Sequence, residues 1–563
     1  MSVSTVAASP PSPWQACYAH PMAWDTVFAP LSVPQMFAQS VARFGDRPLV
    51  DFMGRRFSYA DLNSEARAFA AGLQRLGIAK GDRVGLFLPN VPLYVSAYYG
   101  AMLAGATVVN FSPLYTAAEL AAQVADSGTR LLVTIDSSAL LPTALAVEAQ
   151  SSLERLVVGS LAAQLPWGKG LALRIFSRKS LAEVPAHALH WDDLLADGEP
   201  AEVPLDPEED LALLQYTGGT TGTPKGAMLT HQNITANTRQ VEGLDPRQDE
   251  RDMILGVLPL FHVFANICVL NRTVAHGGCI AMLPRFDAGQ ALNTLARVRA
   301  TAMPGVPTMY QALLDHPDCG RTDFGSLRIC ISGGAPLPLP LKQRFEAATG
   351  ARLIEGYGLT ETAGVATANP YEGAERPGTI GQPIPATRVR LLDKDNPAQD
   401  APAGQPGELA IQGPQVMRGY WRRPEAAAAA FTQRADGRWL RTGDVAVMEA
   451  DGYLRIVDRI KDMIAVGGFK VFPSQLEAVL LRHPAVKEAL VIGVPDAYRG
   501  EAPRAYVTLQ QAGAVTGEVL TSWLNGQLGK HERVEAVVVR ESLPKTMIGK
   551  LDRKALRAEV GLV

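Results

Sequence analysis

Apolar runs of strand length alternate with helical patterns through the first two-thirds of the chain. Such alternation predicts parallel sheets covered by helices, so the fold class expected is α/β. The predicted strands are 83–88, 107–111, 130–134, 156–158, 253–257 and 327–332, and the predicted helices are 59–76, 93–103, 117–127 and 288–298.

The pattern changes after about residue 385. Short strands at 389–392, 408–412 and 454–457, separated by Asp-Gly and Pro-Gly turns, predict a small β-barrel subdomain. Mixed helices and strands then return at 474–482, 489–493, 504–509 and 518–528. The domains expected are a flexible tail at 1–20, a large N-terminal domain of two helix-covered sheets plus the barrel at 21–457, a charged hinge at 458–462, and a small mobile α+β domain at 463–563.

Composition narrows the class of protein. The chain has 563 residues, 47% hydrophobic and 19% charged, as in ordinary globular enzymes. A formal net charge of −3 argues against a nucleic-acid binder. Five scattered cysteines, an odd number, predict reduced thiols rather than disulfides or a zinc site. Because no secretory signal is evident, and Pro, Asn and Gly interrupt the uncharged stretches 84–118 and 253–271, the expected location is cytoplasmic.

The stretch 214–226, Leu-Gln-Tyr-Thr-Gly-Gly-Thr-Thr-Gly-Thr-Pro-Lys-Gly, is the most informative in the chain. Glycines let backbone N–H groups approach phosphate oxygens closely, threonine hydroxyls donate, and a lysine adds a cation. The residues assigned to nucleotide phosphates are Thr217, Gly218, Gly219, Thr220, Thr221, Gly222, Thr223 and Lys225.

Two competing interpretations of this stretch fit less well. A Walker-type loop needs glycine directly before the lysine and Ser or Thr directly after it, whereas Pro224 and Gly226 stand there. A merely flexible surface loop is disfavoured by the motifs that follow. These are Gly-Gly-Ala-Pro at 333–336, Glu-Gly-Tyr-Gly-Leu-Thr-Glu-Thr at 355–362, Thr-Gly-Asp at 442–444, Asp-Arg-Ile-Lys-Asp at 458–462 and Pro-Lys-Thr-Met-Ile-Gly-Lys-Leu-Asp-Arg at 544–553.

In this order, the six motifs resemble those of the adenylate-forming superfamily, which includes acyl-CoA synthetases, luciferases and adenylation domains of peptide synthetases. The resemblance covers roughly residues 50 to 555. It implies ATP, Mg²⁺ and coenzyme A as cofactors and co-substrates. It also implies a nucleoside site built from Gly333, Gly334, Ala335, Glu355, Gly356, Tyr357, Gly358, Asp444 and Arg459.

The same resemblance assigns roles to individual residues. Tyr357 and the Gly333–Ala335 backbone would cover the two faces of adenine, and Asp444 and Arg459 would bind the ribose. A hard carboxylate at Glu361 suits magnesium, with Thr217 as a second ligand, and the neighbouring Thr360 hydroxyl suits phosphate.

Lys550 matches the family's adenylation lysine, which bridges the carboxylate and the α-phosphate. A hinge at 458–462 would let its small domain move away, so that Gly467 and Gly468 line a channel for the pantetheine arm of CoA. Ala465 stands where relatives often carry a polar residue, which leaves no side-chain role for that position.

His262, within Leu-Pro-Leu-Phe-His-Val-Phe, matches the histidine beside the acyl site and is assigned to catalysis; a core histidine is the alternative. The variants at 215–222 and 113–116 are most similar to bacterial long-chain fatty-acid CoA ligases. The activity expected is therefore fatty acyl-CoA synthesis through acyl-AMP, on a medium-to-long-chain acid. An aryl or coumarate-type CoA ligase, an enzyme that loads a carrier protein, and an inactive nucleotide or acyl-AMP sensor stay open.

The segment Trp167–Lys179 interleaves aromatic and aliphatic residues with Lys and Arg. A basic amphipathic segment of this kind suits peripheral contact with an anionic membrane, on its inner face, and a solvated loop is the alternative. A homodimer stays open as well.

Overall fold

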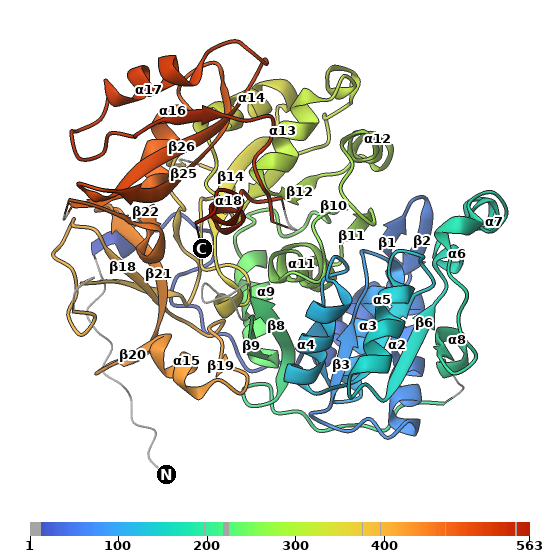
Figure 1. Ribbon diagram of the computed structural model, residues 1–563. Helices are drawn as coiled ribbons and strands as arrows, with labels where there is room; N and C mark the ends of the chain where they lie inside the picture. Colours follow the sequence, from blue (N-terminus) through green and yellow to red (C-terminus); the bar gives the residue numbers. More distant parts are fainter. Residues whose placement is uncertain are drawn as a thin grey trace.

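The computed structural model describes residues 13–195, 198–217, 224–373, 375–393, 396–467, 469–546 and 549–562. Strands of these residues form four sheets (Figure 1). Two large sheets covered by helices make up most of the molecule, and two small sheets lie toward the C-terminus.

One large sheet has the strand order β19-β9-β8-β4-β3-β5-β6-β7 and is parallel from β8 to β7. Its strands are β3 (Arg83–Leu86), β4 (Thr107–Asn110), β5 (Thr129–Ile135), β6 (Arg155–Gly159), β7 (Leu189–His190), β8 (Leu211–Thr217), β9 (Lys225–Thr230) and β19 (Gly419–Tyr420). The antiparallel pairing of β8 with β9 brings the two ends of the phosphate loop together.

The second large sheet has the order β16-β15-β14-β13-β12-β10-β11-β1-β2. Its strands are β1 (Pro48–Phe52), β2 (Arg55–Ser58), β10 (Met253–Gly256), β11 (Cys279–Met282), β12 (Ala302–Gly305), β13 (Ile329–Ser332), β14 (Arg352–Tyr357), β15 (Thr367–Ala368) and β16 (Gln382–Pro383). Parallel strands β12, β13 and β14 end together, so the motifs that follow β13 and end β14 lie at one edge.

Helices of the N-terminal domain pack on these sheets. Ser58 and Thr116 begin α2 and α4 with capping boxes, which satisfy backbone donors at the first turn. The helices are α1 (Val33–Phe44), α2 (Tyr59–Arg75), α3 (Pro92–Leu103), α4 (Ala117–Ser127), α5 (Leu141–Gln150), α6 (Leu161–Gln164), α7 (Trp167–Phe176), α8 (Trp191–Leu194), α9 (His231–Glu242), α10 (Val263–Ala265), α11 (Arg272–His276), α12 (Ala288–Val298), α13 (Pro307–Asp315) and α14 (Leu339–Thr349). A π-helix, η3 (Asn266–Asn271), joins α10 to α11, and short 3₁₀ helices are η1 (Pro13–Cys17), η2 (Arg178–Ser180), η4 (Cys319–Arg321) and η5 (Thr360–Thr362).

The predicted antiparallel subdomain is present as β17 (Arg388–Leu392), β18 (Gly407–Gln412), β20 (Phe431–Arg434), β21 (Gly437–Met448) and β22 (Leu454–Arg459), with α15 (Pro424–Ala429) beside them. The 3₁₀ helix η6 (Ile460–Asp462) then leads into the last domain. That domain contains β23 (Ile464–Val466), β24 (Phe469–Val471), α16 (Pro473–Leu480), β25 (Val486–Asp496), β26 (Gly500–Leu509), α17 (Gly517–Asn525), β27 (Val537–Val539) and α18 (Arg553–Glu559).

The α/β prediction is confirmed, including the type of every predicted helix and strand. One hydrophobic cluster spans Val33–Leu440, and a separate cluster lies within residues 464–537. The uncharged stretches are buried: α3 is inaccessible to solvent from Pro92 to Met102, and 253–271 supplies β10, α10 and η3. In the described ranges, each helix is too short or too polar to cross a bilayer.

Candidate active site

The strands that flank the Gly/Thr-rich loop bring Lys225 and Glu361 to the same aromatic residue, Tyr420. Lys225 begins β9 opposite Thr217 of β8, and its Nζ lies 5.4 Å from the ring centroid of Tyr420. The Tyr420 hydroxyl donates to Oε1 of Glu361 at 2.7 Å, and β19 is antiparallel to β9. Residues Gly218–Thr223 lie outside the described residues. The two ends of the loop are thus joined to the Glu-Gly-Tyr-Gly-Leu-Thr-Glu motif through an aromatic residue.

Tyr420 is a contributor that the sequence analysis missed. Burial, together with the Glu361 carboxylate, raises the pKa of the Tyr420 hydroxyl above its usual range, so the hydroxyl stays a donor. Among the described residues no other donor reaches the Glu361 side chain. The carboxylate therefore keeps oxygen lone pairs for a cation, as a magnesium ligand requires.

A second group joins Tyr357, Asp444 and Arg459. The Tyr357 hydroxyl donates to Oδ2 of Asp444 at 2.5 Å, and Arg459 Nε lies 2.9 Å from Oδ1. Asp444 and Arg459 face each other across the β21–β22 pair, which explains how residues in different motifs meet. Asp444 is only 2% exposed, so the partners of its carboxylate are the Tyr357 hydroxyl and the Arg459 guanidinium rather than water.

Lys550 reaches this group from the C-terminal domain. A Cβ on Gly334 would clash with Cε of Lys550 and lie 2.8 Å from Nζ, and Gly334 has a φ of 79°. The positive φ favours glycine at this position, and the lack of a side chain leaves room for the end of the lysine. The Thr308 hydroxyl donates to the Gly549 carbonyl at 2.9 Å, which holds the lysine segment against α13.

Electrostatics around Lys550 favour a cation that gives up its proton readily. Burial and, to a smaller extent, the positive charge of Arg459 lower the pKa of its ammonium to about 8, and Asp444 opposes the shift. An anion bound next to the Lys550 ammonium would raise the pKa again and favour the charged lysine.

His262 lies next to an apolar pocket. Its Nδ1 accepts from the Phe264 backbone N–H at 3.3 Å, as the N-cap of α10. Burial, with the Lys550 charge, lowers the pKa of the imidazole to about 3, so the ring is neutral. The pocket is small and partly open to solvent, and it is lined by Leu258, Pro259, His262, Phe264, Ala265 and Val306.

The glycine-rich motifs pack directly on one another. A Cβ on Gly333 would lie 3.5 Å from the Gly356 carbonyl oxygen and 3.0 Å from the Phe264 ring, and one on Gly358 would overlap the Gly364 carbonyl oxygen. The half-buried Glu355 carboxyl has its pKa raised to about 8 by loss of solvent. Gly356 ends β14 with Tyr357, and Ala335 follows Gly334 between β13 and α14.

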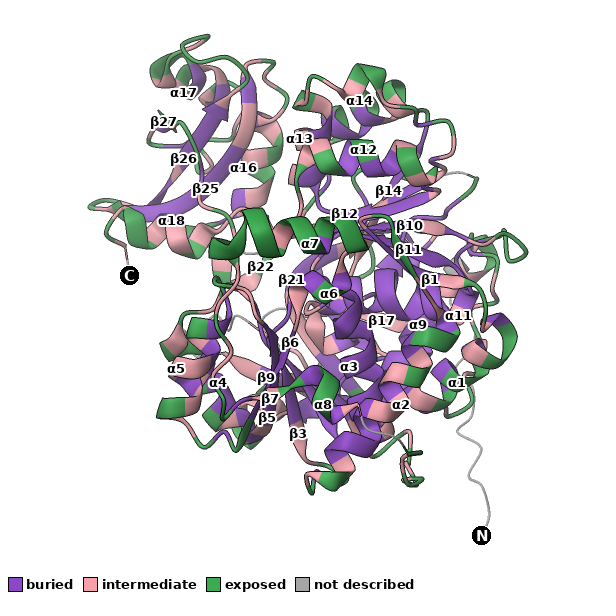
Figure 2. Cartoon of the chain, turned by 90° about the vertical axis from the view of Figure 1, so that its right-hand side faces the viewer, coloured by how far each residue is buried: buried purple, intermediate pink, exposed green. Residues whose placement is uncertain are grey.

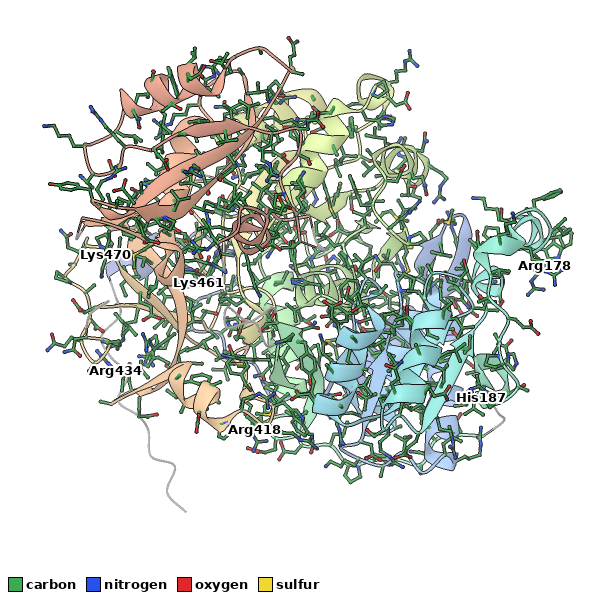
Figure 3. The ribbon with its side chains drawn as sticks, in the orientation of Figure 1. Arg178, His187, Arg418, Arg434, Lys461 and Lys470 are labelled. Atoms are coloured by element: carbon green, nitrogen blue, oxygen red, sulfur yellow. The ribbon has the colours of Figure 1, made fainter. Side chains whose placement is uncertain are left out.

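The predicted hinge is a junction rich in charge (Figure 3, Lys461). Asp458 accepts from the backbone N–H groups of Arg459 at 2.7 Å and Ser474 at 2.8 Å, and burial raises the pKa of its carboxyl to about 6. Arg553 Nη1 lies 2.7 Å from Oδ2 of Asp462. Hydrogen bonds and an ion pair therefore hold both ends of the 458–462 segment to the C-terminal domain.

Gly467 is exposed in this arrangement, with a φ of 56°, and its N–H donates to the Arg499 carbonyl at 2.8 Å. Gly468 lies outside the described residues.

Thr360 begins η5, directly before Glu361. In the described part of the chain, no group of three or more His, Cys, Asp or Glu side chains could hold a metal ion. A magnesium site would need phosphate or water oxygens beside Glu361 and Thr217.

Comparison with known families defines the class of this fold and site. Residues 37–421 match the family described as AMP-binding enzyme, and residues 475–550 match the AMP-binding enzyme C-terminal domain. The chain belongs to the AMP-binding enzyme family.

Relatives over the full length point to a narrower group. The chain is 37% identical to a long-chain-fatty-acid–CoA ligase of Bacillus subtilis (strain 168), covering 97% of this chain and 98% of the relative. It is 39% identical to one from Escherichia coli O6:H1, covering 94% of each. Among solved structures, ATP-bound MatB from Rhodopseudomonas palustris is similar with a TM-score of 0.81 and 30% identity, covering 94% of this chain and 99% of MatB.

The Glu361 carboxylate gives a direct test of the metal assignment. Glu361→Gln keeps the shape and the Tyr420 contact but removes the anionic ligand, so we expect a higher magnesium requirement and lower turnover. Titrating MgCl₂ at fixed ATP measures both. The matched control is Tyr420→Phe, which removes only the hydroxyl and should shift the magnesium requirement less. An unaltered magnesium curve in Glu361→Gln would remove this residue from the metal site.

Proposed function

We propose that the chain is an ATP-dependent fatty acyl-CoA ligase that acts through acyl-AMP. In the first step a carboxylate oxygen attacks the α-phosphorus of ATP and pyrophosphate leaves. In the second, the sulfur of CoA attacks the acyl carbonyl, the thiol proton is lost, and AMP leaves. The near full-length relationship to long-chain-fatty-acid–CoA ligases supports this activity.

One observation carries the proposal: the half-buried Lys550 lies against Gly334 and beside the Asp444–Arg459 pair. The ribose would be bound by Asp444 and Arg459. The adenine would lie between Tyr357 and the Gly333–Ala335 backbone. Lys550 would then stand over the α-phosphate, where charge develops as the carboxylate attacks. The neutral His262 would border the acid, because its ring lies at the apolar pocket.

Glu361 and Thr217 would hold Mg²⁺, and Lys225 would bind the phosphates of ATP. When bound, the ion would neutralise charge on the phosphate oxygens. The contacts of Glu361 with Tyr420, and of Tyr420 with Lys225, support this assignment, since they bring the carboxylate and the ammonium to the same aromatic residue.

The acyl substrate is the property to test first. An apolar pocket rewards length, because each buried methylene contributes roughly 0.8 kcal/mol until the space is full. We expect kcat/KM to rise from acetate through octanoate and to favour medium-to-long chains over cinnamate or benzoate. Pyrophosphate release across C2 to C18 and aromatic acids measures this. If kcat/KM for a hydroxycinnamate exceeded that for dodecanoate, the result would instead favour an aryl-CoA ligase.

A carrier-loading enzyme and a nucleotide sensor would each give a different result in the same assay. A carrier-loading enzyme would release pyrophosphate but form no thioester with free CoA. A sensor of nucleotide or acyl-AMP would bind ATP and release no pyrophosphate. The presence of Lys225, Glu361, Asp444 and Lys550 around one site favours catalysis over sensing.

We also propose that α7 rests on an anionic membrane surface. This helix lies at the outer edge of the N-terminal domain, and Figure 2 shows it exposed along almost its whole length. Trp167 is 84% and Phe176 85% exposed. The segment from 167 to 182 has no acidic residue, and its cations are Lys169, Arg174, Arg178 and Lys179 (Figure 3, Arg178). Apolar side chains among cations suit the headgroup boundary.

The membrane proposal predicts a specific loss of vesicle binding. We expect the double variant Trp167→Ala, Phe176→Ala to bind vesicles with a third of their lipid anionic about tenfold more weakly, with unchanged activity on a soluble acid. Tyr498→Ala, at a 96% exposed aromatic of the C-terminal domain, is the control. Vesicle co-sedimentation measures binding, and 1 M salt should weaken it in the parent. Equal binding by all three proteins would contradict the proposal.

A further inference from the structure

The C-terminal domain contacts the N-terminal domain at both ends of helix α13. In the first turn, the Thr308 hydroxyl donates to the carbonyl of Gly549, the residue directly before Lys550, at 2.9 Å. At the last residue of the helix, Oδ2 of Asp315 lies 2.7 Å from Nζ of Lys487. The two helix residues are separated by about 10 Å along the axis, as seven helical steps require. Two contacts this far apart restrict rotation of one domain on the other, which a single contact would allow.

Asp315 is oriented from within its own domain. Its Oδ1 accepts from Nε2 of Gln311 at 2.6 Å, and Nη2 of Arg344, on α14, lies 3.8 Å from the same oxygen. Because Gln311 and Arg344 both belong to the N-terminal domain, they hold the carboxylate in place independently of the C-terminal domain. The second oxygen, Oδ2, then faces the C-terminal domain and accepts from Lys487.

Lys487 lies at a β-bulge. The pairing of β25 with β26 shifts by one residue between Val486 and Glu488, so Lys487 is the additional residue on β25. A bulge bends its strand and redirects a side chain, and bulges are frequent next to active sites. The side chain redirected by this bulge is the one that bonds to α13.

We propose that the Asp315–Lys487 ion pair is a positioning contact for adenylation, because it favours the docked arrangement in which Lys550 lies at Gly334. The pair acts through the position of the C-terminal domain and not on the reacting groups. This inference rests on the proposed two-step ligase activity. It adds a contact, at the far end of α13 from Lys550, that sets the balance between the two steps.

The exposure of the pair sets the size of the effect. The side chains of Lys487 and Asp315 are 34% and 35% exposed, and an ion pair of this kind favours its bound arrangement by up to about fivefold. Under the proposed hinge, the first half-reaction uses the docked arrangement and the second uses another. The ratio of the two rate constants is therefore proportional to the docking equilibrium constant, whichever arrangement predominates.

The first experiment measures this ratio in Lys487→Gln. Single-turnover formation of dodecanoyl-AMP gives the first rate constant, and single-turnover reaction of ready-made dodecanoyl-AMP with CoA gives the second. We expect the ratio of the first to the second to fall by about two- to fivefold, and Lys487→Arg, which keeps the charge, to restore most of it. If both half-reactions lose the same factor in Lys487→Gln, the residue has only a structural role and the inference is overturned.

Arg504→Gln is the matched control. It breaks an ion pair with Glu535, at 2.8 Å, that is similarly exposed and lies wholly within the C-terminal domain. Loss of this pair should leave the ratio of the two half-reactions unaltered. An equal fall of the ratio in Arg504→Gln would trace the effect to the stability of the domain, against the inference.

Asp315→Asn tests whether the two residues act as a pair. It removes the charge and keeps an acceptor for Gln311. Each single variant, and the double variant Asp315→Asn, Lys487→Gln, should lower the ratio by the same factor, since one contact can be lost only once. Effects that multiply in the double variant would mean that the residues act separately.

A zero-length cross-link tests the contact without an activity assay. A water-soluble carbodiimide activates the Asp315 carboxyl, the Lys487 amine attacks it and loses a proton, and an amide forms as a urea leaves. Peptide mass spectrometry should find this amide in the parent, together with the one between Lys545 and Glu488, which lie 2.6 Å apart within the C-terminal domain. The second amide without the first would overturn the inference. If the first amide forms but no acid from C2 to C18 releases pyrophosphate, the proposed ligase activity fails while the docking contact stands.

Discussion

Lys550→Ala should lower acyl-AMP formation by about 10²–10³-fold, the usual cost of losing one preorganised donor to the transition state. Thioester formation from ready-made dodecanoyl-AMP and CoA should stay largely intact, because under the proposed hinge the C-terminal domain would carry the lysine away from Gly334 and the nucleotide group for that step. ATP–pyrophosphate exchange measures the first reaction, and single-turnover transfer to CoA the second. Equal damage to both would mean that the lysine has no role specific to adenylation.

Lys545→Ala is the matched control, since it removes a lysine of the same segment that pairs with Glu488 at 2.6 Å. A pH profile gives an independent check. The pKa of Lys550 is lowered to about 8, so its cation is present below that value and is lost as pH rises. The kcat/KM for adenylation, which reports the free enzyme, should therefore fall above about pH 8. The basic limb should be absent from Lys550→Ala.

Lys461→Pro should impair the second half-reaction on the order of tenfold more than the first. Proline fixes φ near −65°, which the 3₁₀ turn of η6 already approximates, so the docked arrangement of the C-terminal domain survives. A second arrangement of that domain requires a change of backbone angle at the hinge, which proline resists. Single-turnover assays of acyl-AMP formation and of transfer to CoA separate the two steps.

The control for this prediction is Lys461→Ala, which removes the same cation without restricting φ. It should behave as the parent in both half-reactions, since Lys461 is exposed. If the proline variant formed acyl-AMP as slowly as it formed thioester, the pivot would lie elsewhere between Asp458 and the last domain.

The sequence predicted the motifs well because each combines special backbone needs with charged or aromatic chemistry at a fixed spacing. Tyr420 was missed because no recognisable motif surrounds it: it follows an ordinary Arg-Gly pair. Only the pairing of β19 with β9 brings it to Glu361. The roles assigned to the candidate site residues, including Gly218–Thr223 and Gly467 with CoA, stay predictions.

If Asp444 and Arg459 bind the ribose and the chain pivots at η6, as proposed, the register that pairs these two residues would couple nucleotide occupancy to domain orientation. Arg459 is the last residue of β22, and the hinge helix η6 begins at the next residue. Any rotation at η6 therefore begins one peptide bond away from the guanidinium that holds Asp444. By linkage, a nucleotide that prefers one position of Arg459 shifts the population toward the matching domain orientation, by no more than its difference in affinity for the two. Under this proposal, exchange of ATP for AMP during turnover would bias the enzyme toward its next conformation without a separate signal.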